Sequence, residues 1–196
     1  MANIKKGLLI IMSGPSGVGK GTVRREVMKD ENVNLVYSIS MTTRYQRTGE
    51  QNGVDYYFVS KEDFKKAIEN DELLEWAEFV GNFYGTPKQK VEELRNQGKD
   101  VILEIEVNGT EQVLNKFRGD EGVISIFLYP PSFEALESRI RGRSTETEDL
   151  IQERLAKASR EMKLKTRYDY VVINDNLEKA SNEIKEIIKN KKSMIL

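Results

Sequence analysis

The stretch Gly14-Pro15-Ser16-Gly17-Val18-Gly19-Lys20-Gly21-Thr22 decides the fold that this sequence predicts. It follows a continuously apolar run from Gly7 to Ser13, which is typical of a strand buried on both faces of a parallel sheet. Glycines in such a turn let backbone N–H groups face inward as an anion nest, and a helix that begins there adds partial positive charge. The spacing therefore predicts a P-loop, in which Lys20 reaches the β- and γ-phosphates of a nucleotide.

This P-loop departs from the strict pattern at one position. The residue after the lysine is usually Ser or Thr, whose hydroxyl binds Mg²⁺, but here it is Gly21 and the hydroxyl comes one residue later, on Thr22. The sequence leaves open whether any hydroxyl contacts the metal directly. An ordinary glycine-rich turn between a strand and a helix is the alternative interpretation, and the combination of strand, spacing, lysine and helix disfavours it.

Further apolar runs at 101–103, 123–128 and 170–173 indicate three more buried strands. Helical patterns lie between these runs and after the last one. Alternation of strands and helices predicts an α/β fold in which helices cover both faces of a parallel sheet. The expected helix ends are Thr86-Pro87 and Gly98 around one segment, Ser60 and Ser132 at the start of two others, and a capping box of Thr145 and Glu148.

Residues 37–85 break this alternation. The region is richer in Thr, Tyr, Arg and Gly, it contains turn signals such as Asn52-Gly53, and 56–59 reads as a short strand. We therefore predict a small mixed α/β lobe at 37–85, inserted into a core formed by 1–36 and 86–196.

Composition narrows the chemistry and the partners. The 31 Lys and Arg residues balance 32 Asp and Glu residues, which argues against a general nucleic-acid binder. The chain contains no Cys and no His, so disulfides, thiolate nucleophiles, Cys-based zinc sites and imidazole bases are excluded. The apolar run from Leu8 to Met12 is too short for a signal or membrane segment, and we expect a cytoplasmic protein without a membrane partner. The oligomeric state cannot be read from the sequence.

Beyond the P-loop, the sequence resembles the guanylate kinase family over nearly its whole length. The resemblance rests on Ser38–Arg44, Arg47, Gly49-Glu50, Gly53, Asp55-Tyr56, Glu75-Trp76-Ala77, Gly81–Thr86, Leu103–Glu106, Gly142-Arg143 and Asn174-Asp175. It implies the fold of the P-loop nucleoside monophosphate kinases and the transfer of the γ-phosphoryl group of Mg-ATP to GMP, giving GDP and ADP. It also implies that Gly14–Thr22 and Asn174 bind ATP, that the inserted lobe binds GMP, and that a lid at about 137–155 closes over ATP.

The acceptor phosphate needs planar donors with permanent charge. Arg44 and Arg47 lie three residues apart and can converge on one dianion. By the family resemblance, Tyr56 and Tyr84 add hydroxyl donors to the same phosphate, and Arg44 also takes part in catalysis. The alternative for the two arginines is a solvated charged turn.

Guanine differs from adenine in presenting N1–H and a 2-amino group as donors on one edge, and a carboxylate is their natural partner. The family resemblance assigns this part to Glu75, adds Ser40 and Thr86 as contacts to the base, and makes Glu106 a second candidate acceptor. The alternative for Glu75 is a surface charge at a helix end. We expect Trp76 to be a core residue rather than a ligand.

Glu104 and Glu106 are expected at the end of a buried strand that faces the P-loop. An acidic residue at this place usually orients the hydration shell of Mg²⁺, so Glu104 is expected to hold the metal through water, although two strand-end surface carboxylates are the alternative. The resemblance implies that the lid brings catalytic arginines to the transferred group. Besides Lys20 and Arg44, the expected catalytic residues are Arg139, Arg143 and Arg154.

The absence of histidine does not impede this chemistry, because the attacking phosphate oxygen is already largely ionised at neutral pH. Positioning and charge neutralisation by Lys20, the arginines and Mg²⁺ are sufficient. Two rival functions remain at this stage. One is a noncatalytic guanylate kinase-like module that binds peptides, and the other is a small P-loop kinase with a different acceptor.

Overall fold

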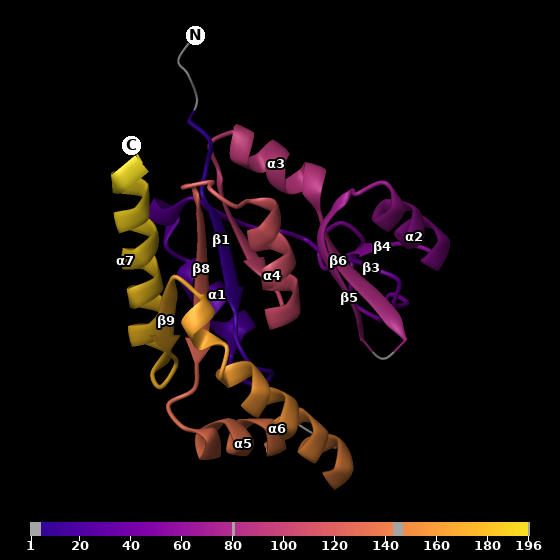
Figure 1. The fold of residues 1–196 in the computed structure, drawn as a ribbon, viewed down its shortest axis with the longest axis vertical. Helices are drawn as coiled ribbons and strands as arrows, with labels where there is room; N and C mark the ends of the chain where they lie inside the picture. The colour runs from indigo at the N-terminus through magenta and orange to yellow at the C-terminus, as the bar shows by residue number, and fades with distance from the viewer. Residues whose placement is uncertain (1–4, 80, 143–146, 196) are drawn as a thin grey trace.

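The computed structural model of the chain describes residues 5–79, 81–142 and 147–195. Its centre is a five-stranded sheet in which every neighbouring pair of strands is parallel, as Figure 1 shows. The order across the sheet is β2 (Leu35–Tyr37), β7 (Asp100–Glu104), β1 (Leu9–Ser13), β8 (Val123–Tyr129) and β9 (Tyr170–Ile173). The predicted parallel α/β fold is therefore confirmed.

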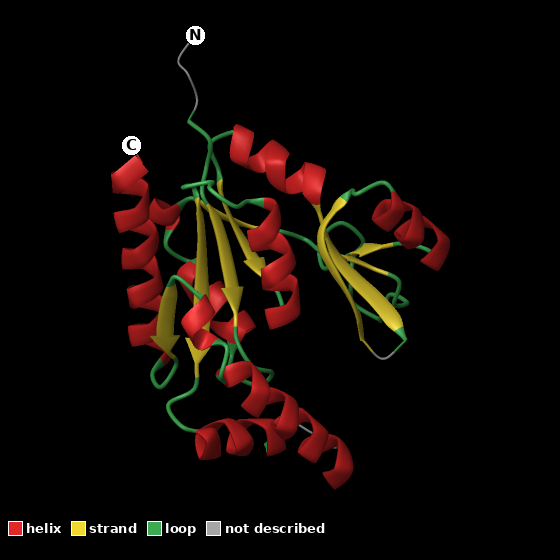
Figure 2. Ribbon diagram, in the orientation of Figure 1, coloured by secondary structure: helices red, strands yellow, loops and turns green. Residues whose placement is uncertain are grey.

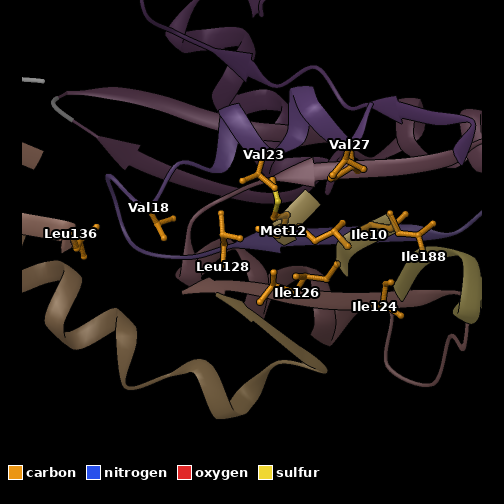
Figure 3. Packing of buried hydrophobic residues seen from close by; sticks show 14 of the residues in the cluster. Ile10, Met12, Val18, Val23, Val27, Ile124, Ile126, Leu128, Leu136 and Ile188 are labelled. Atoms are coloured by element: carbon orange, nitrogen blue, oxygen red, sulfur yellow. The ribbon is translucent and has the colours of Figure 1, made fainter. Parts of the chain in front are cut away.

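Two hydrophobic cores lie on opposite faces of this sheet, because alternate side chains of β1 point to opposite sides. Ile10 and Met12 pack in the larger core, which Figure 3 shows from close by, while Leu9 and Ile11 pack in the other. The larger core is covered by α1 (Lys20–Val27), α5 (Phe133–Arg141), α6 (Glu148–Met162) and α7 (Leu177–Ile195), and the other by α3 (Lys88–Asn96) and α4 (Val107–Lys116). Burial on both faces explains why the strand sequences are continuously apolar.

A second, four-stranded sheet stands beside the core (Figures 1 and 2). It is mixed, since β3 pairs parallel with β4 and antiparallel with β6. It carries its own small apolar cluster, centred on Phe64 of α2. The elements are β3 (Met41–Thr42), β4 (Tyr57–Phe58), α2 (Lys61–Glu69), β5 (Leu73–Phe79) and β6 (Asn82–Pro87).

Strand β5 contains a β-bulge next to the residue that we expect to read the base. Leu73 pairs with Pro87 and Trp76 pairs with Gly85, so three steps along β5 match two steps along β6. The extra residue interrupts the alternation of inward and outward side chains. As a result, Leu73, Leu74 and Glu75 are all buried, and Trp76 is turned outward.

The helix ends agree with the sequence in some places and differ in others. The side chains of Ser60 and Ser132 cap α2 and α5, as predicted. The expected start of α3 at Thr86-Pro87 is wrong by one residue, because β6 continues to Pro87 and the helix begins at Lys88. Thr145, expected to cap α6, lies outside the described residues, and the N-cap residue is Thr147.

None of the helices in the described ranges is long and apolar enough to cross a lipid bilayer.

Candidate active site

A cleft of about 740 Å³ lies at the carboxyl end of the core strands and continues onto the lobe. It brings together residues from three parts of the chain that are distant in sequence. Of the residues predicted to bind substrates or metal, it is lined by Ser16, Gly17, Gly19, Lys20, Gly21, Thr22, Ser40, Tyr56, Glu75, Tyr84, Glu104 and Glu106. The carboxyl edge of a parallel sheet is where ligands bind in open α/β folds.

The P-loop has the backbone shape that its glycines predict. Gly19 is the N-cap of α1 and has a φ of 99°, a left-handed conformation that favours glycine. Lys20 Nζ donates hydrogen bonds to the carbonyl oxygens of Gly14 at 2.6 Å and Pro15 at 3.2 Å. These bonds hold the ammonium group over the loop. Burial lowers the pKa of Lys20, and the negative charge of Glu104 partly opposes this shift.

Three of the other predicted residues brace the P-loop in this structure. The Val18 carbonyl accepts hydrogen bonds from Asn174 Nδ2 at 2.8 Å and from Arg139 Nη1 at 3.4 Å. Arg139 Nη2 also donates to the Asn174 carbonyl at 2.9 Å, and Arg154 Nη2 donates to Ser16 Oγ at 3.0 Å. Arg143 lies outside the described residues.

The Glu104 carboxylate lies within van der Waals contact of position 21 of the P-loop. Its Oε1 and Oε2 lie 3.4 and 3.6 Å from the place of a β-carbon on Gly21. Arg24 Nε donates to Glu104 Oε2 at 2.9 Å, and the Arg24 guanidinium lies 3.8 Å over the ring of Tyr37. Burial, together with the Glu104 charge, raises the pKa of Tyr37 to about 12.

The donor atoms at this corner fit Mg²⁺. The described residues contain no cluster of three or more His, Cys, Asp or Glu that could hold a metal alone. Glu104 and Thr22 nevertheless place a carboxylate and a hydroxyl along the wall of the cleft. Mg²⁺ bound with a nucleotide usually takes one or two such oxygen ligands and fills its remaining positions with water and phosphate oxygens.

The two predicted phosphate-binding arginines meet at one acidic residue of the lobe. Arg44 Nη2 and Nη1 lie 2.7 and 3.0 Å from the two carboxylate oxygens of Glu50, and the backbone N–H of Arg47 donates to Glu50 Oε2 at 2.8 Å. The rings of Tyr56 and Tyr84 lie 6.1 Å apart, and the Arg44 guanidinium is 5.4 Å from the Tyr56 ring centroid. Tyr56 and Tyr84 line the cleft, whereas Arg44 and Arg47 do not, and the Arg44 guanidinium lies next to the lining at the Tyr56 ring.

Glu75 is the buried acid of the cleft, with 7% of its surface exposed. Thr86 Oγ1 donates to Glu75 Oε1 at 2.6 Å. Burial raises the pKa of Glu75 to about 7, against the lowering effect of the Thr86 hydrogen bond and with a further increase from the charge of Glu106. The alternative of a surface charge at a helix end is wrong, because Glu75 is buried within a strand.

The structure adds residues that sequence reasoning did not single out. Arg25, Tyr37 and Phe79 line the cleft. Lys157 of α6 pairs with Glu106 at 2.7 Å and lies 6.0 Å from the Phe79 ring centroid, so α6 meets the start of α4 and the end of the lobe strand β5 there. No motif marks these residues. The expectation that Trp76 is a core residue is wrong, because 39% of its surface is exposed.

Comparison with known proteins assigns the family. The family model described as guanylate kinase matches residues 6–191. The chain belongs to the guanylate kinase family. It is 58% identical over 183 residues to a guanylate kinase of Mesoplasma florum, covering 93% of this chain but 61% of the relative. A Bacillus subtilis guanylate kinase is 53% identical over 184 residues, which make up 94% of this chain and 89% of the relative.

Solved structures agree with this family assignment. A crystal structure of guanylate kinase from Anaplasma phagocytophilum superposes with a TM-score of 0.74 at 33% identity, covering 95% of this chain and 87% of the other. A shikimate kinase from Bacteroides thetaiotaomicron matches at 14% identity with a TM-score of 0.50, over 93% of this chain and 98% of the other. This second likeness shows the shared fold alone.

Proposed function

We propose that this chain transfers the γ-phosphoryl group of Mg-ATP to GMP, giving GDP and ADP. The observation that carries the proposal is the buried Glu75 carboxylate, held by Thr86 in the cleft that also contains the P-loop. A buried acceptor of this kind suits the N1–H and 2-amino donors of guanine, and the P-loop suits a nucleoside triphosphate.

The division of labour that we propose follows the chain. The core, 1–36 and 86–196, binds ATP through Gly14–Thr22 and Asn174, and the lobe, 37–85, binds GMP. Arg44, Arg47, Tyr56 and Tyr84 of the lobe hold the acceptor phosphate. Glu75 and Ser40 of the lobe hold the base, together with Thr86 and Glu106 of the core. The positions of Ser40, Tyr56, Glu75, Tyr84 and Glu106 along the cleft support this assignment, as do the contacts of Arg44 with Tyr56 and of Thr86 with Glu75.

Catalysis in this proposal consists of positioning and of neutralising charge. Lys20 binds the β- and γ-phosphates, and Arg44 aligns the acceptor oxygen with the transferred group. Segment 137–155 acts as the lid, through which Arg139, Arg143 and Arg154 approach the phosphates. Mg²⁺, when bound near Glu104 and Thr22, supplies charge stabilisation to the phosphate oxygens. A cytoplasmic location and the absence of a nucleic-acid partner stay predictions.

A coupled assay of ADP release tests the proposal directly. The purified chain is given Mg-ATP with GMP, AMP, UMP or CMP in separate reactions. We expect rapid turnover with GMP alone, and its loss when Mg²⁺ is chelated. Preference for another monophosphate would show a different acceptor. No turnover with any of them, in a folded protein, would favour a noncatalytic binding module.

A further inference from the structure

Helix α4 of the core runs alongside strand β5 of the lobe, and three residues on one face of the helix contact that strand. They are Gly109, Gln112 and Lys116, spaced three and four residues apart, as expected for one helical face. Lys116 Nζ donates to the Leu73 carbonyl at 2.9 Å and also pairs with Asp71. The helix therefore follows β5 through the bulge that carries Glu75.

Gln112 completes the hydrogen bonding of the strand at Trp76. Its Oε1 accepts from the Trp76 backbone N–H at 3.1 Å, and its Nε2 donates to the Trp76 carbonyl at 3.0 Å. β5 is an edge strand, so these backbone groups have no neighbouring strand on that side. The side-chain amide takes the place of the missing strand. It fixes the peptide groups on both sides of Trp76, and the first of these joins Trp76 to Glu75.

Gly109 provides the space for the Glu75 carboxylate. A β-carbon at position 109 would lie 2.6 Å from Glu75 Oε2, 3.2 Å from its Cδ and 3.3 Å from its Cγ. The other carboxylate oxygen, Oε1, accepts the hydrogen bond from Thr86. The carboxylate is thus confined between α4 on one side and Thr86 on the other.

We infer that Gly109 and Gln112 are positioning residues for guanine recognition, Gly109 by admitting the Glu75 carboxylate against α4 and Gln112 by fixing the backbone beside it. This inference rests on the proposed function, because it assigns the two residues a part in binding GMP. Neither side chain needs to touch the substrate. Both act through Glu75.

A purely structural role for Gly109 makes a different prediction. Alanine is a better helix former than glycine, and position 109 lies inside a helix with no positive φ. Gly109→Ala should therefore leave the helix as stable as before or more so, while it displaces the carboxylate. Stability and GMP binding should change independently. If Gly109 were needed only for packing, the Gly109→Ala variant would lose stability and GMP binding together.

The test compares Gly109→Ala and Gln112→Ala with the unchanged chain and with Gln89→Ala. Gln89 is a matched control, because it is an exposed helical glutamine whose side chain, among the described residues, bonds to Glu93 of its own helix. For each protein we would measure the melting temperature, the Kd of GMP by calorimetry, and KM for GMP and for ATP. Turnover of IMP, which lacks the 2-amino group, gives a second readout of carboxylate position.

For Gly109→Ala we expect KM for GMP to rise by about 10-fold or more, and for Gln112→Ala by about 3- to 10-fold, with KM for ATP nearly unchanged. The preference for GMP over IMP should shrink in both, and Gln89→Ala should match the unchanged chain. Wild-type GMP binding in a folded Gly109→Ala protein would overturn the inference. Equal changes in KM for GMP and in KM for ATP would overturn it as well. If Gly109→Ala fails to fold, Gln112→Ala decides by the same comparison of KM for GMP with KM for ATP. If the unchanged chain does not bind GMP, the proposed function itself fails.

Discussion

Arg44 and Glu50 form a two-pronged ion pair, in which both terminal nitrogens of the guanidinium bond to the two carboxylate oxygens at 3.0 and 2.7 Å. The hydrogen bonds to Glu50 raise the pKa of Arg44, and those from Arg44 lower the pKa of Glu50. Because Glu50 also accepts from the Arg47 backbone, one carboxylate orders the whole turn. The arginine proposed to bind the acceptor phosphate is therefore oriented by the protein itself.

Removal of either arginine should weaken the binding of the acceptor GMP much more than the binding of ATP. We expect Arg44→Ala or Arg47→Ala to raise KM for GMP by about 10- to 100-fold, with little change in KM for ATP, because a charge-assisted contact to one phosphate is lost. Steady-state kinetics with each substrate varied in turn provides the measurement. Arg118→Ala, at an exposed arginine after α4, is the control. Equal effects on both substrates would place the acceptor phosphate elsewhere.

Lys20→Ala should leave a folded protein that turns over very slowly. We expect kcat to fall by about 100-fold or more, since the lysine stabilises charge on the transferred group in the transition state. Circular dichroism and thermal unfolding check the fold, and single-turnover kinetics measures the chemical step. A well-folded variant with near-normal kcat would show that the P-loop lysine has no catalytic part.

Glu75→Gln should reduce the preference of the enzyme for guanine over adenine. The amide keeps the shape of the carboxylate but replaces one acceptor with a donor, so kcat/KM for GMP should fall by about 10- to 1000-fold. The GMP-over-AMP ratio should fall with it, while ATP affinity stays nearly unchanged. If the variant retained the wild-type ratio, another residue would read the base, and Glu106 would be the next candidate.

The pKa of about 7 at Glu75 predicts a pH dependence of GMP use. Guanine donors require the ionised carboxylate, so kcat/KM for GMP should fall as the pH drops through 7. Stability should move the other way. Because the pKa in the folded state lies above that in the unfolded state, Glu75 favours folding most below its unfolded pKa, and this contribution is lost as the pH rises through 7.

Comparison of the wild type with Glu75→Gln isolates both effects, since the titration of the GMP phosphate is common to the two proteins. We would measure kcat/KM and the melting temperature from pH 5.5 to 8.5. The variant should show a flatter kcat/KM profile and a smaller loss of stability at high pH. Parallel profiles in the two proteins would mean that Glu75 does not titrate in this range.

Arg95 is a stability residue remote from the chemistry. Its side chain is 1% exposed, and its Nε and Nη2 donate to the Gly7 carbonyl at 2.9 Å and to Asp120 at 3.0 Å, at the opposite end of the core sheet from the P-loop. Arg95→Leu should lower the free energy of unfolding by about 2 kcal/mol or more, because it removes the donor from the Gly7 carbonyl, from Asp120 and from Glu92. Urea denaturation measures this loss. Unaltered KM values in the surviving folded protein would agree with the assignment, and selective loss of GMP binding would contradict it.

The core was predictable from sequence because burial on both faces leaves mostly apolar runs, as in Leu9–Ser13 and Val123–Tyr129, where serine is the only polar residue type. α4 was not predicted as a helix. Its start at Val107, Asn108, Gly109 and Thr110 consists of weak helix formers, and the side chain of its N-cap residue, Glu106, makes no capping hydrogen bond to the helix. Packing against β1 and β5 stabilises this helix. These contacts join residues distant in sequence, so the local sequence pattern does not reveal them.

The residue types of the site were also predictable, because phosphates require lysine and arginine and guanine requires an acceptor. Their mutual arrangement was not. The ion pair of Arg24 with Glu104 joins residues 80 positions apart, and Arg139 bonds to the back of the P-loop from 121 positions away. The outward orientation of Trp76 depends on the bulge in β5, which alternation alone does not reveal.

Trp76 has a practical consequence for observing this protein at work. It is the sole tryptophan of the chain, it lies on the lobe 6.0 Å from the Phe83 ring centroid, and its backbone is bound to Gln112 of the core. Any rotation of the lobe against α4 changes the water contact of an indole that is now partly exposed. Its fluorescence emission, excited at wavelengths that tyrosine does not absorb, is therefore an internal reporter of lobe movement, readable in stopped flow on the unlabelled protein without a second tryptophan to subtract.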